Sequence, residues 1–562
     1  MKFIHKILLC TLLAFAVSSC GDMFDLDINE DPNNPSQASS RLLLTSSQYN
    51  LMADLANASE NLMGFAGILA SFDQWSIGQS DFNGFWGGMY ADQFKDIEGL
   101  IQANEGETGS PQYLGIAKIM KAYLLATMVD LFGDIPYSEA LKGDAADKIT
   151  NPKFDDDKAV YDEAFKLIEE GIANVNDPRR PVAVTGDIIY AGNAARWTSF
   201  ANTLKLRMLL NTRLVNPTAK ADIQAVLDGG KFIKTDAEDF NFQFSKTVTP
   251  DNRHPWYQSS YIAGTNGFTY ILHQYMVEML ADKDPRISFY FRRITKTILD
   301  QADPSQRNTT PCSQTPACFY RYLVLNSSIH QQLYGTTDLT QAQKDYLAGF
   351  FGRDRADPAG IPLDGDLRLI PGVYPAGGFF DVANAALPAA NAAPGGGIFP
   401  ALTSVNVLYY QIEAILTLGV TGDARALFEK AIRDHIKKVV DFGVRTDANS
   451  TRPPYTRPDG VQVDIDAYVN LWLQRYDNAT GTDAKLNVVA KQLWFSSWGN
   501  GFDIYNMMRR TGLPSTLQQP ILPIRNFPLR LPYPQQELTL NPNAAAYKDV
   551  IYDRDPIFWD AN

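Results

Sequence analysis

Apolar residues recur every three or four positions over much of the first half of the chain. Such stripes occupy residues 51–69, 120–132 and 197–208, and further ones occupy residues 155–172 and 405–418. This spacing gathers apolar side chains on one face of an α-helix. The stripe at 120–132 stops at a glycine with a proline three residues further on, which is a typical helix end. We therefore predict long helices that pack through one face.

One segment, YYQIEAILTLGVTGDARALFEKAIRDHI, predicts a helical hairpin. Its first helix should end near Gly419 and its second should begin near Asp423. Ala424, Phe428 and Ala431 then stand at offsets of 0, 4 and 7. This order of small and aromatic residues matches a tetratricopeptide hairpin, although a coincidental helical hairpin is the alternative. Because the hairpins do not follow one another in tandem, we predict a modified repeat array.

The pattern changes between about residues 231 and 402. FNFQF (240–244) alternates like a short strand, and residues 371–402 are rich in Gly, Pro and Ala, which indicates loop. The end of the chain, residues 513–562, carries five closely spaced prolines after residue 519 and suits an extended wrap over the surface.

The predicted fold is therefore mainly α. A tetratricopeptide-like helical repeat scaffold occupies about 41–230 and 403–512, with a long loop-rich insertion at about 231–402. Together with the Pro-rich wrap, these parts form one predicted domain over 41–562.

The N-terminus predicts an exported, lipid-anchored protein. Lys2 and Lys6 precede an apolar run of 11 residues, Ile7 to Val17, which is too short to span a bilayer but suits a signal peptide. The run ends in Val17-Ser18-Ser19-Cys20, which resembles the bacterial lipobox. We predict a signal peptide at 1–19, lipidation of Cys20, and an acidic tether at 20–40. A plain signal peptide that happens to contain a cysteine is the alternative.

Charge and cysteine content narrow the function further. The formal net charge is −13, which opposes binding to nucleic-acid phosphates. Cys312 and Cys318 enclose five residues in a polar segment. In an exported protein such a pair indicates a disulfide, whereas zinc would need further ligands nearby.

Sequence motifs for catalysis are missing. HExxH, GxSxG, GxxxxGK[ST] and CxxC do not occur, and the five histidines are scattered. We predict a protein that is not an enzyme and needs neither a cofactor nor a metal. A glycosidase carboxylate pair is a matter of three-dimensional spacing, so the sequence does not decide against one, nor against calcium binding.

Aromatic residues among polar ones are the candidate ligand contacts, because sugar rings offer apolar faces and hydroxyl rims. In DQWSIGQSDFNGFWGGMY (73–90) we select Trp75 with Asp73 and Asn83, burial of the tryptophan being the alternative. Trp86 and Tyr90 are four residues apart, so we assign both to the buried face of a helix.

A second candidate segment is DNRHPWYQSSYIAGTNGF (251–268). Trp256, Tyr257 and Tyr261 lie there among Asn, Gln, Ser and Gly without clear helical or strand periodicity. Aromatic residues in a loop favour ligand binding. A third segment, CFYRYLVLN (318–326), alternates like a strand with one face of unknown exposure.

Two features near residue 500 are assigned to structure. Trp494 and Trp498 are four apart and should pack in the core. Arg509 and Arg510 should cap the carbonyl groups at the end of their helix, although clamping a carboxylate is the alternative.

Several segments together resemble the SusD/RagB family of outer-membrane nutrient-binding lipoproteins. Besides Cys20 with its acidic follow-on, they are LFGDIPYSEAL (131–141), RWTSFANTLKLRML (196–209), the hairpin at 409–432, QLWFSSWGNGFDIYNMMRRTG (492–512) and RLPYPQQELTLNPN (530–543). The resemblance implies a helical repeat scaffold with a ligand-binding face. It also implies a partnership, as a hinged lid, with a SusC-like TonB-dependent outer-membrane barrel.

We therefore expect a lipoprotein of the outer membrane, facing the cell exterior, that captures a nutrient oligomer and delivers it to that barrel. An oligosaccharide is the first expectation for the ligand. Peptides are the alternative, because the same residue types bind them. The sequence is also compatible with a degradative surface enzyme, and with a pure assembly subunit that contacts the barrel but binds no ligand.

Overall fold

The computed structural model describes residues 38–70, 77–143, 148–179, 181–262, 269–294, 327–357, 368–382, 395–522 and 526–561. The predicted lipidation site Cys20 and the pair Cys312 and Cys318 lie outside these ranges. The candidate ligand contacts Asp73 and Trp75, and the strand-like segment 318–326, also lie outside them.

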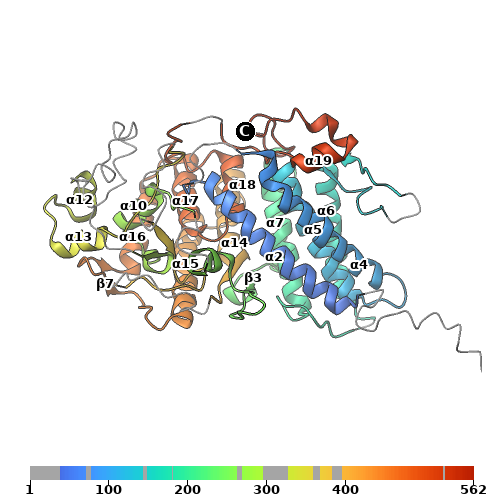
Figure 1. Cartoon of the computed structure of the whole chain (residues 1–562), viewed down its shortest axis with the longest axis horizontal. Helices are drawn as coiled ribbons and strands as arrows, with labels where there is room; N and C mark the ends of the chain where they lie inside the picture. Colours follow the sequence, from blue (N-terminus) through green and yellow to red (C-terminus); the bar gives the residue numbers. More distant parts are fainter. Residues whose placement is uncertain are drawn as a thin grey trace, which may run out of the picture.

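Long helices packed side by side form one half of the molecule, at the right in Figure 1. We call it the scaffold half. These helices are α2 (Ser40–Phe65), α4 (Lys95–Asn104), α5 (Pro111–Phe132), α6 (Asp157–Val175), α7 (Ala194–Asn211) and α8 (Ala219–Gly229). Between α2 and α4 the chain forms η3 (Gln79–Phe82), α3 (Asn83–Gly88) and the π-helix η4 (Met89–Phe94), and after α7 it forms η5 (Thr212–Leu214).

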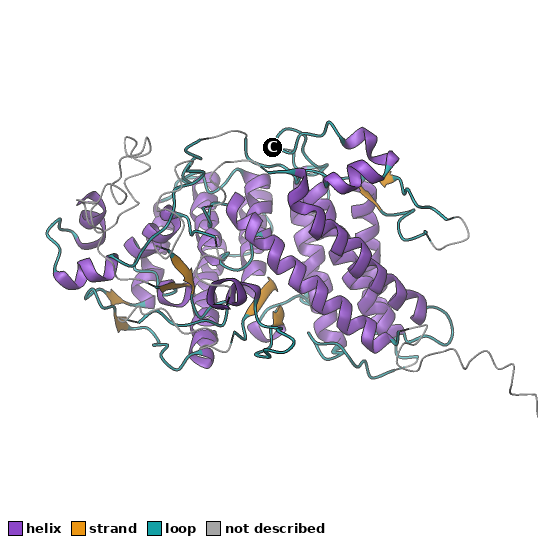
Figure 2. Cartoon of the chain, viewed as in Figure 1, coloured by secondary structure: helices purple, strands orange, loops and turns teal. Residues whose placement is uncertain are grey.

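The other half, which we call the loop-rich half, combines long helices with short ones and long connections (Figures 1 and 2). Its long helices are α14 (Ser404–Leu418), α15 (Ala424–Thr446), α16 (Ile465–Asn478), α17 (Thr482–Ser496) and α18 (Phe502–Thr511). The shorter elements are η6 (Asp236–Glu238), α9 (Pro255–Tyr257), the π-helix η7 (Gln258–Ile262), α10 (His273–Ala281), α11 (Ile287–Tyr290), α12 (Ser327–Tyr334) and α13 (Gln341–Leu347). Near the C-terminus α19 (Gln535–Leu540) and η13 (Pro542–Tyr547) follow.

The strands are short and pair two by two, all antiparallel. The pairs are β1 (Ile135–Pro136) with β2 (Phe154–Asp155), β3 (Phe240–Gln243) with β6 (Ile398–Leu402), β4 (Phe291–Arg293) with β5 (Leu369–Pro371), and β7 (Tyr455–Thr456) with β8 (Gln462–Val463). The strand expected in residues 240–244 is confirmed as β3. The mainly α fold is likewise confirmed (Figure 2).

The predicted helical hairpin is α14 and α15. Helix α14 ends at Gly419, which adopts a φ of +66° that favours glycine, and the side chain of Asp423 caps α15 by accepting from the N–H of Ala426. Ala424, Phe428 and Ala431 are all buried. The small–aromatic–small spacing therefore identified a buried face of α15, on which the ring of Phe428 lies 5.4 Å from that of Tyr476 on α16.

Helices α5 and α6 approach each other through glycines. A Cβ atom on Gly115 would lie 2.5 Å from the backbone nitrogen of Val175 and 2.8 Å from the backbone oxygen of Gly171. Only a residue without a side chain fits there, because both obstacles are backbone atoms. Helix α5 is buried along most of its length and forms the centre of this half.

The C-terminal segment crosses the ends of α5 and α6, at the top in Figure 1. It is held by the carboxylate of Asp130, which accepts hydrogen bonds from the Trp559 indole at 2.9 Å and from Asn506 at 3.0 Å. The N–H of Leu531 also donates to the carbonyl of Leu131 at 2.6 Å. A buried carboxylate with several donors thus ties the last residues of the chain to its central helix.

In the loop-rich half, buried arginines satisfy backbone carbonyl groups. Arg293 donates to the carbonyls of Tyr346 and Val382, each at 3.1 Å, and Arg355 donates to those of Phe65 and Gln518. Irregular backbone needs such partners, because it lacks the ladders of helices and sheets. The guanidinium group, with five donors, supplies several at once.

Candidate functional site

The candidate aromatic residues between 251 and 261 lie in short helices, although their sequence shows no clear helical periodicity. Helix α9 begins after His254, whose Nδ1 accepts from the N–H of Trp256 at 3.1 Å, and the chain continues into η7. Tyr257 and Tyr261 therefore lie on one face, with their rings stacked 4.9 Å apart. The short length and the wider π-turn explain why periodicity alone missed these elements.

The three aromatic side chains of this segment are buried. Trp256, Tyr257 and Tyr261 are 3%, 0% and 6% exposed. Trp256 packs on Trp498 with ring centroids 5.0 Å apart, and the Tyr261 hydroxyl donates to the carbonyl of Pro371 at 2.7 Å. As they lie here, the rings pack on protein instead of offering faces to solvent. Their contact with a ligand stays a prediction.

A carboxyl group with an unusual pKa lies against Trp256. Burial raises the pKa of Glu60, on α2, to about 7, and a hydrogen bond with the Trp256 side chain opposes this rise. The helical scaffold therefore meets the aromatic segment through a carboxyl group that titrates near neutral pH.

Described residues that flank the two candidate aromatic segments lie beside each other. The N–H of Ala70 donates to the carbonyl of Tyr270 at 2.8 Å, and Leu69 pairs with Ile271 in an antiparallel bridge. Residue 70 precedes the segment 71–76, and Thr269 follows the segment 263–268. The described residues that flank Trp75 and the end of the second aromatic segment are thus brought together.

Two arginines from later segments of the chain also contact Tyr270 and its neighbours. The guanidinium groups of Arg353 and Arg368 both lie against the ring of Tyr270, at 3.8 and 4.2 Å from its centroid. The N–H of Arg353 donates to the carbonyl of Ile271 at 3.1 Å, and the N–H of His273 donates to the carbonyl of Arg353 at 2.8 Å. We call the described residues 68–70, 269–273, 351–357 and 368 the loop edge. It combines hydrogen-bonded backbone with two cations that lie against an aromatic ring.

Asn83 is separate from the loop edge. It is half-buried at the start of α3, and its side-chain oxygen accepts from the N–H of Gln536 at 3.1 Å. Of its neighbours, Trp86 is buried as predicted, whereas Tyr90 is only half-buried. Both were predicted to lie on the buried face of a helix, and Tyr90 does pack against the core, with its ring 5.1 Å from that of Trp86.

A groove of about 910 Å³ lies between α6, α7 and α8. Its lining includes the apolar residues Phe165, Leu209 and Val226, together with Phe558 from the C-terminal segment. A hollow of this size lies within the range of ligand pockets, roughly 300–1,000 Å³. Sequence reasoning missed it, because each of the three helices reads by itself as an ordinary amphipathic helix.

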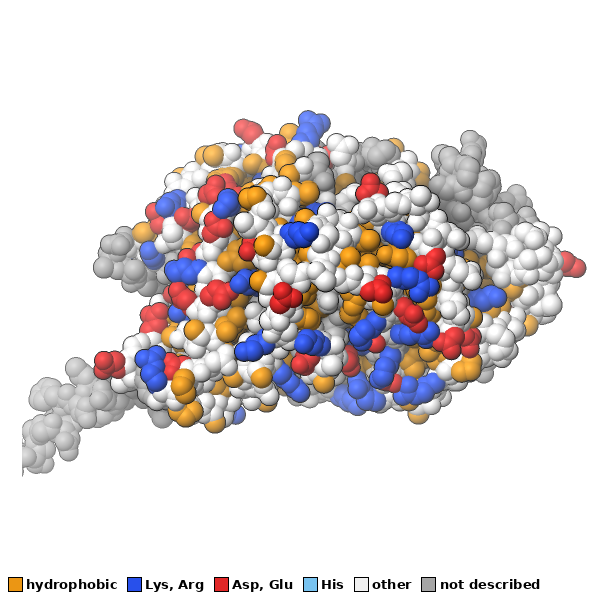
Figure 3. Space-filling view, turned by 180° about the vertical axis from the view of Figure 1, so that it is seen from behind, with side chains coloured by type: hydrophobic (Ala, Val, Ile, Leu, Met, Phe, Trp, Pro, Cys, Tyr) orange, Lys and Arg blue, Asp and Glu red, His pale blue; other side chains and the backbone are white. Residues whose placement is uncertain are grey.

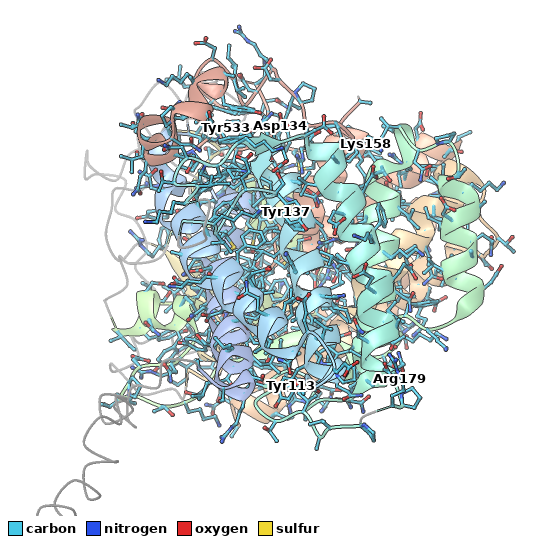
Figure 4. All side chains as sticks on the ribbon, turned by 90° about the vertical axis from the view of Figure 1, so that its right-hand side faces the viewer. Tyr113, Asp134, Tyr137, Lys158, Arg179 and Tyr533 are labelled. Carbon is cyan, nitrogen blue, oxygen red and sulfur yellow. The ribbon has the colours of Figure 1, made fainter. Side chains whose placement is uncertain are left out.

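Most charged side chains on the groove are paired. Lys158 lies 2.7 Å from Asp162 on α6, and Lys205 of α7 lies 2.6 Å from Glu169. Figure 3 shows acidic and basic side chains interspersed over the rear face, with hydrophobic ones between them, and Figure 4 shows Lys158 near the upper end of α6. The groove therefore offers donors and acceptors without a strong net charge.

The two arginines near residue 510 do not cap their helix. Arg510 forms an ion pair with the buried Glu413 at 2.8 Å, and Arg509 donates to the carbonyl of Leu529 at 2.7 Å. The prediction of capping was wrong: a carboxylate from α14, distant in sequence, is the stronger partner for a bidentate guanidinium. Trp494 and Trp498, in contrast, are fully buried, as predicted.

Within the described ranges, no group of three or more His, Cys, Asp or Glu side chains is placed to hold a metal ion. None of the helices in those ranges has the length and apolar character needed to cross a membrane.

Comparison with known proteins gives a family. Residues 32–310 match a family model described as starch-binding and associating with the outer membrane. No curated protein sequence matches the chain.

Solved structures share the fold. A SusD/RagB family protein from Bacteroides thetaiotaomicron superposes with a TM-score of 0.64 at 19% identity, covering 94% of this chain and all of that one. A chitin-binding SusD homologue from Flavobacterium johnsoniae gives 0.61 at 15% identity, covering 93% and 99%. An outer membrane protein from Bacteroides vulgatus linked to nutrient binding gives 0.63 at 17% identity, covering 93% and 100%. With the family match and a fold shared along more than nine-tenths of its length, the chain belongs to the SusD-like family.

Proposed function

We propose that this chain captures a nutrient oligosaccharide at the outer surface of the outer membrane and delivers it to a TonB-dependent barrel. The observation that carries the proposal is the match of residues 32–310 to a family described as starch-binding. A chitin-binding protein among the structural neighbours supports the same ligand class.

The proposed ligand site lies above the loop edge. Trp75 would stack on a sugar ring, with Asp73 directing its hydroxyls. Asn83, which is separate from the loop edge, would contact a further part of an extended ligand. The pairing of Ala70 with Tyr270 favours this location, because it brings the base of the Trp75 segment beside that of the second aromatic segment. Trp256, Tyr257 and Tyr261 would then support the site from below, touching ligand only if their segment moves.

Lipidation of Cys20 would anchor the chain, because the cysteine of a lipobox carries two or more acyl chains. That number is enough for stable membrane attachment, whereas one chain is not. The SusC-like barrel is the proposed partner. A binding role without catalysis fits a chain in which the usual hydrolase motifs do not occur. Replacing Cys20 by Ser should release the protein from the membrane fraction, whereas a plain signal peptide would make that change silent.

Affinity electrophoresis of the soluble chain, residues 21–562, tests the ligand class. Gels containing soluble starch or glycol chitin should retard the native protein. Trp75→Ala should weaken binding about tenfold, the size expected for losing one stacking ring, and Trp75→Phe should restore most of it. Retardation that Trp75→Ala leaves unchanged would contradict the proposed site. Unchanged nutrient uptake in cells carrying Trp75→Ala or Trp256→Ala would favour the assembly role.

Peptide ligands are the second candidate, and the groove between α6, α7 and α8 is the observation that favours them. Its paired charges and apolar lining could bind peptide groups and side chains alike. Ala225, exposed on α8, lines the groove, whereas Ala221 is exposed on the same helix but outside the lining. If peptides bind there, Ala225→Arg should abolish binding and Ala221→Arg should not.

A further inference from the structure

A small cleft lies beside Tyr137, between η4, α4 and the turn that follows β1. Its volume is about 250 Å³, and Tyr90, Phe94 and Tyr137 supply its aromatic lining. It is formed by the scaffold half and shares no residue with the loop edge. We propose that this cleft is a second saccharide subsite, which binds a single pyranose ring. The proposal rests on the proposed function for its ligand class.

The helix that forms one wall changes its winding at the cleft. Residues 83–104 are helical throughout, as α3, η4 and α4, but the middle part, Met89–Phe94, is a π-helix. π-Turns inside α-helices occur frequently at functional sites. Here the wider turn places the rings of Tyr90 and Phe94 5.2 Å apart at the cleft, and the Tyr90 hydroxyl donates to the carbonyl of Pro136 at 2.7 Å. The hydroxyl is therefore engaged, and the apolar ring surface is what the cleft presents.

The lip of the cleft carries an unusual leucine. Leu141 adopts a φ of +61° and is 44% exposed. The left-handed region is unfavourable for a residue with a branched side chain, and exposure leaves the leucine with little packing in return. Both features are explained if Leu141 closes over an apolar ring face.

Polar groups surround the aromatic lining. Glu98 and Lys121 form an ion pair at 2.7 Å, with the Lys121 ammonium 5.3 Å from the centre of the Tyr137 ring. Gln102 and Lys142 are exposed on the same rim. A pyranose has the matching arrangement, an apolar face bordered by hydroxyl groups. The polar residues on the rim of the cleft supply both donors and acceptors for those hydroxyls.

Charge and size narrow the ligand class. Burial raises the pKa of Tyr137 above its ordinary value, and the nearby carboxylates of Glu163, Glu98, Asp155 and Glu170 add to the rise. Each of these carboxylates is paired with a lysine, so the surroundings of the cleft carry little net charge and favour a neutral sugar over an ion. The volume falls below the range of about 300–1,000 Å³ for sites that enclose a larger ligand, which suits one ring instead of a chain. Figure 4 shows Tyr137 on a different side of α6 from Lys158, so this subsite and the groove are separate.

Saturation-transfer NMR on the soluble chain, residues 21–562, tests the subsite. The probes are methyl β-glucopyranoside and the methyl glycoside of N-acetylglucosamine. The native protein should transfer saturation to at least one of them, and Gln102→Trp, which blocks the cleft, should reduce the transfer by more than half. Ala103→Trp is the matched control, because Ala103 is an exposed neighbour that does not line the cleft.

Leu141→Gly separates binding from folding. Glycine accepts the backbone conformation of residue 141, so the variant should unfold at the same or a higher temperature, yet lose more than half of the transfer. Absence of transfer with the native protein, or equal transfer in Gln102→Trp and Ala103→Trp, would overturn the subsite. Failure of the proposed function would give a different result. The polysaccharide gels would not retard the native protein, while saturation transfer to the methyl glycosides would persist.

Discussion

The two halves of the molecule solve the same problem, burial of polar backbone, in different ways. In the scaffold half, helices satisfy their own N–H and C=O groups and meet through apolar faces or through glycines such as Gly115. In the loop-rich half, side chains such as those of Arg293 and Arg355 reach carbonyl groups far along the chain. The first half is therefore held by many similar contacts, and the second by a few specific ones.

This difference suits the two proposed roles. A helical scaffold tolerates change at single surface positions, whereas a loop edge fixed by arginines holds its connections in one geometry. A ligand site benefits from such a base, because binding loses affinity when loops must first be ordered. Four tests by substitution can break or sharpen the comparison.

The largest effect is expected in the loop-rich half, at Arg286. This fully buried guanidinium binds Asp284 through two hydrogen bonds of 2.6 and 2.9 Å and also donates to Tyr468 and Ser496. Arg286→Met would leave Asp284 buried without its cation. We expect a loss of about 3–5 kcal/mol in the free energy of unfolding, measured in urea.

The double variant Arg286→Met with Asp284→Asn is the control, since it removes both charges. It should recover part of the loss. If the single and double variants were equally stable, buried ion pairs would not be what holds this half together.

The next effect concerns Glu60, where the halves meet. Its pKa is raised to about 7 from an ordinary 4.5, so the folded chain holds this proton more tightly than the unfolded chain. The resulting stability is fully present below about pH 4.5 and is lost as the pH rises through about 7. Glu60→Gln should flatten the fall in unfolding free energy between pH 5 and pH 8 by up to about 3 kcal/mol. An unchanged slope would contradict the burial of this carboxyl group.

In the scaffold half, one substitution should have opposite signs at two glycines. Gly115→Ala would push a Cβ against the backbone of α6, so we expect a loss of about 1–3 kcal/mol. At Gly99 of α4 the nearest atom is 3.7 Å away, in Leu43, and Gly99→Ala should be neutral or stabilising by up to about 1 kcal/mol. Thermal unfolding of both variants checks this, and equal effects would show that close helix contact is not what selects glycine at 115.

The smallest effect is at the hairpin. Asp423→Ala removes the cap of α15 and should cost about 1 kcal/mol, whereas Asp423→Ser should retain most of the stability. The urea midpoint is the measurement. A loss as large with serine as with alanine would mean that the carboxylate acts through charge instead of the capping hydrogen bond.

Periodicity predicted helices and a strand in both halves, because a regular element records its buried face in local spacing. The turn between α14 and α15, the buried faces of Ala424 and Phe428, and the strand at 240–244 were all readable in this way. The resemblance of short segments, from LFGDIPYSEAL to the C-terminal prolines, supplied the family.

The contacts that hold the loop-rich half could not be predicted, because they join residues far apart in sequence. Nothing near Arg510 indicates that Glu413 is its partner, and nothing near Ala70 indicates Tyr270. The aromatic residues Trp256, Tyr257 and Tyr261 have a composition typical of a binding loop, yet tertiary packing buries them. Their polar neighbours were a weak signal, since short helices also carry such residues on one side.

The most direct test of the proposed function is calorimetric titration of the soluble chain, residues 21–562, with two ligand pools, mixed oligosaccharides and mixed peptides. We predict heat with the oligosaccharides, greatly reduced in Trp75→Ala, and none with the peptides. Heat with peptides alone would contradict the proposed ligand class, and heat with neither pool would contradict ligand capture by the isolated chain.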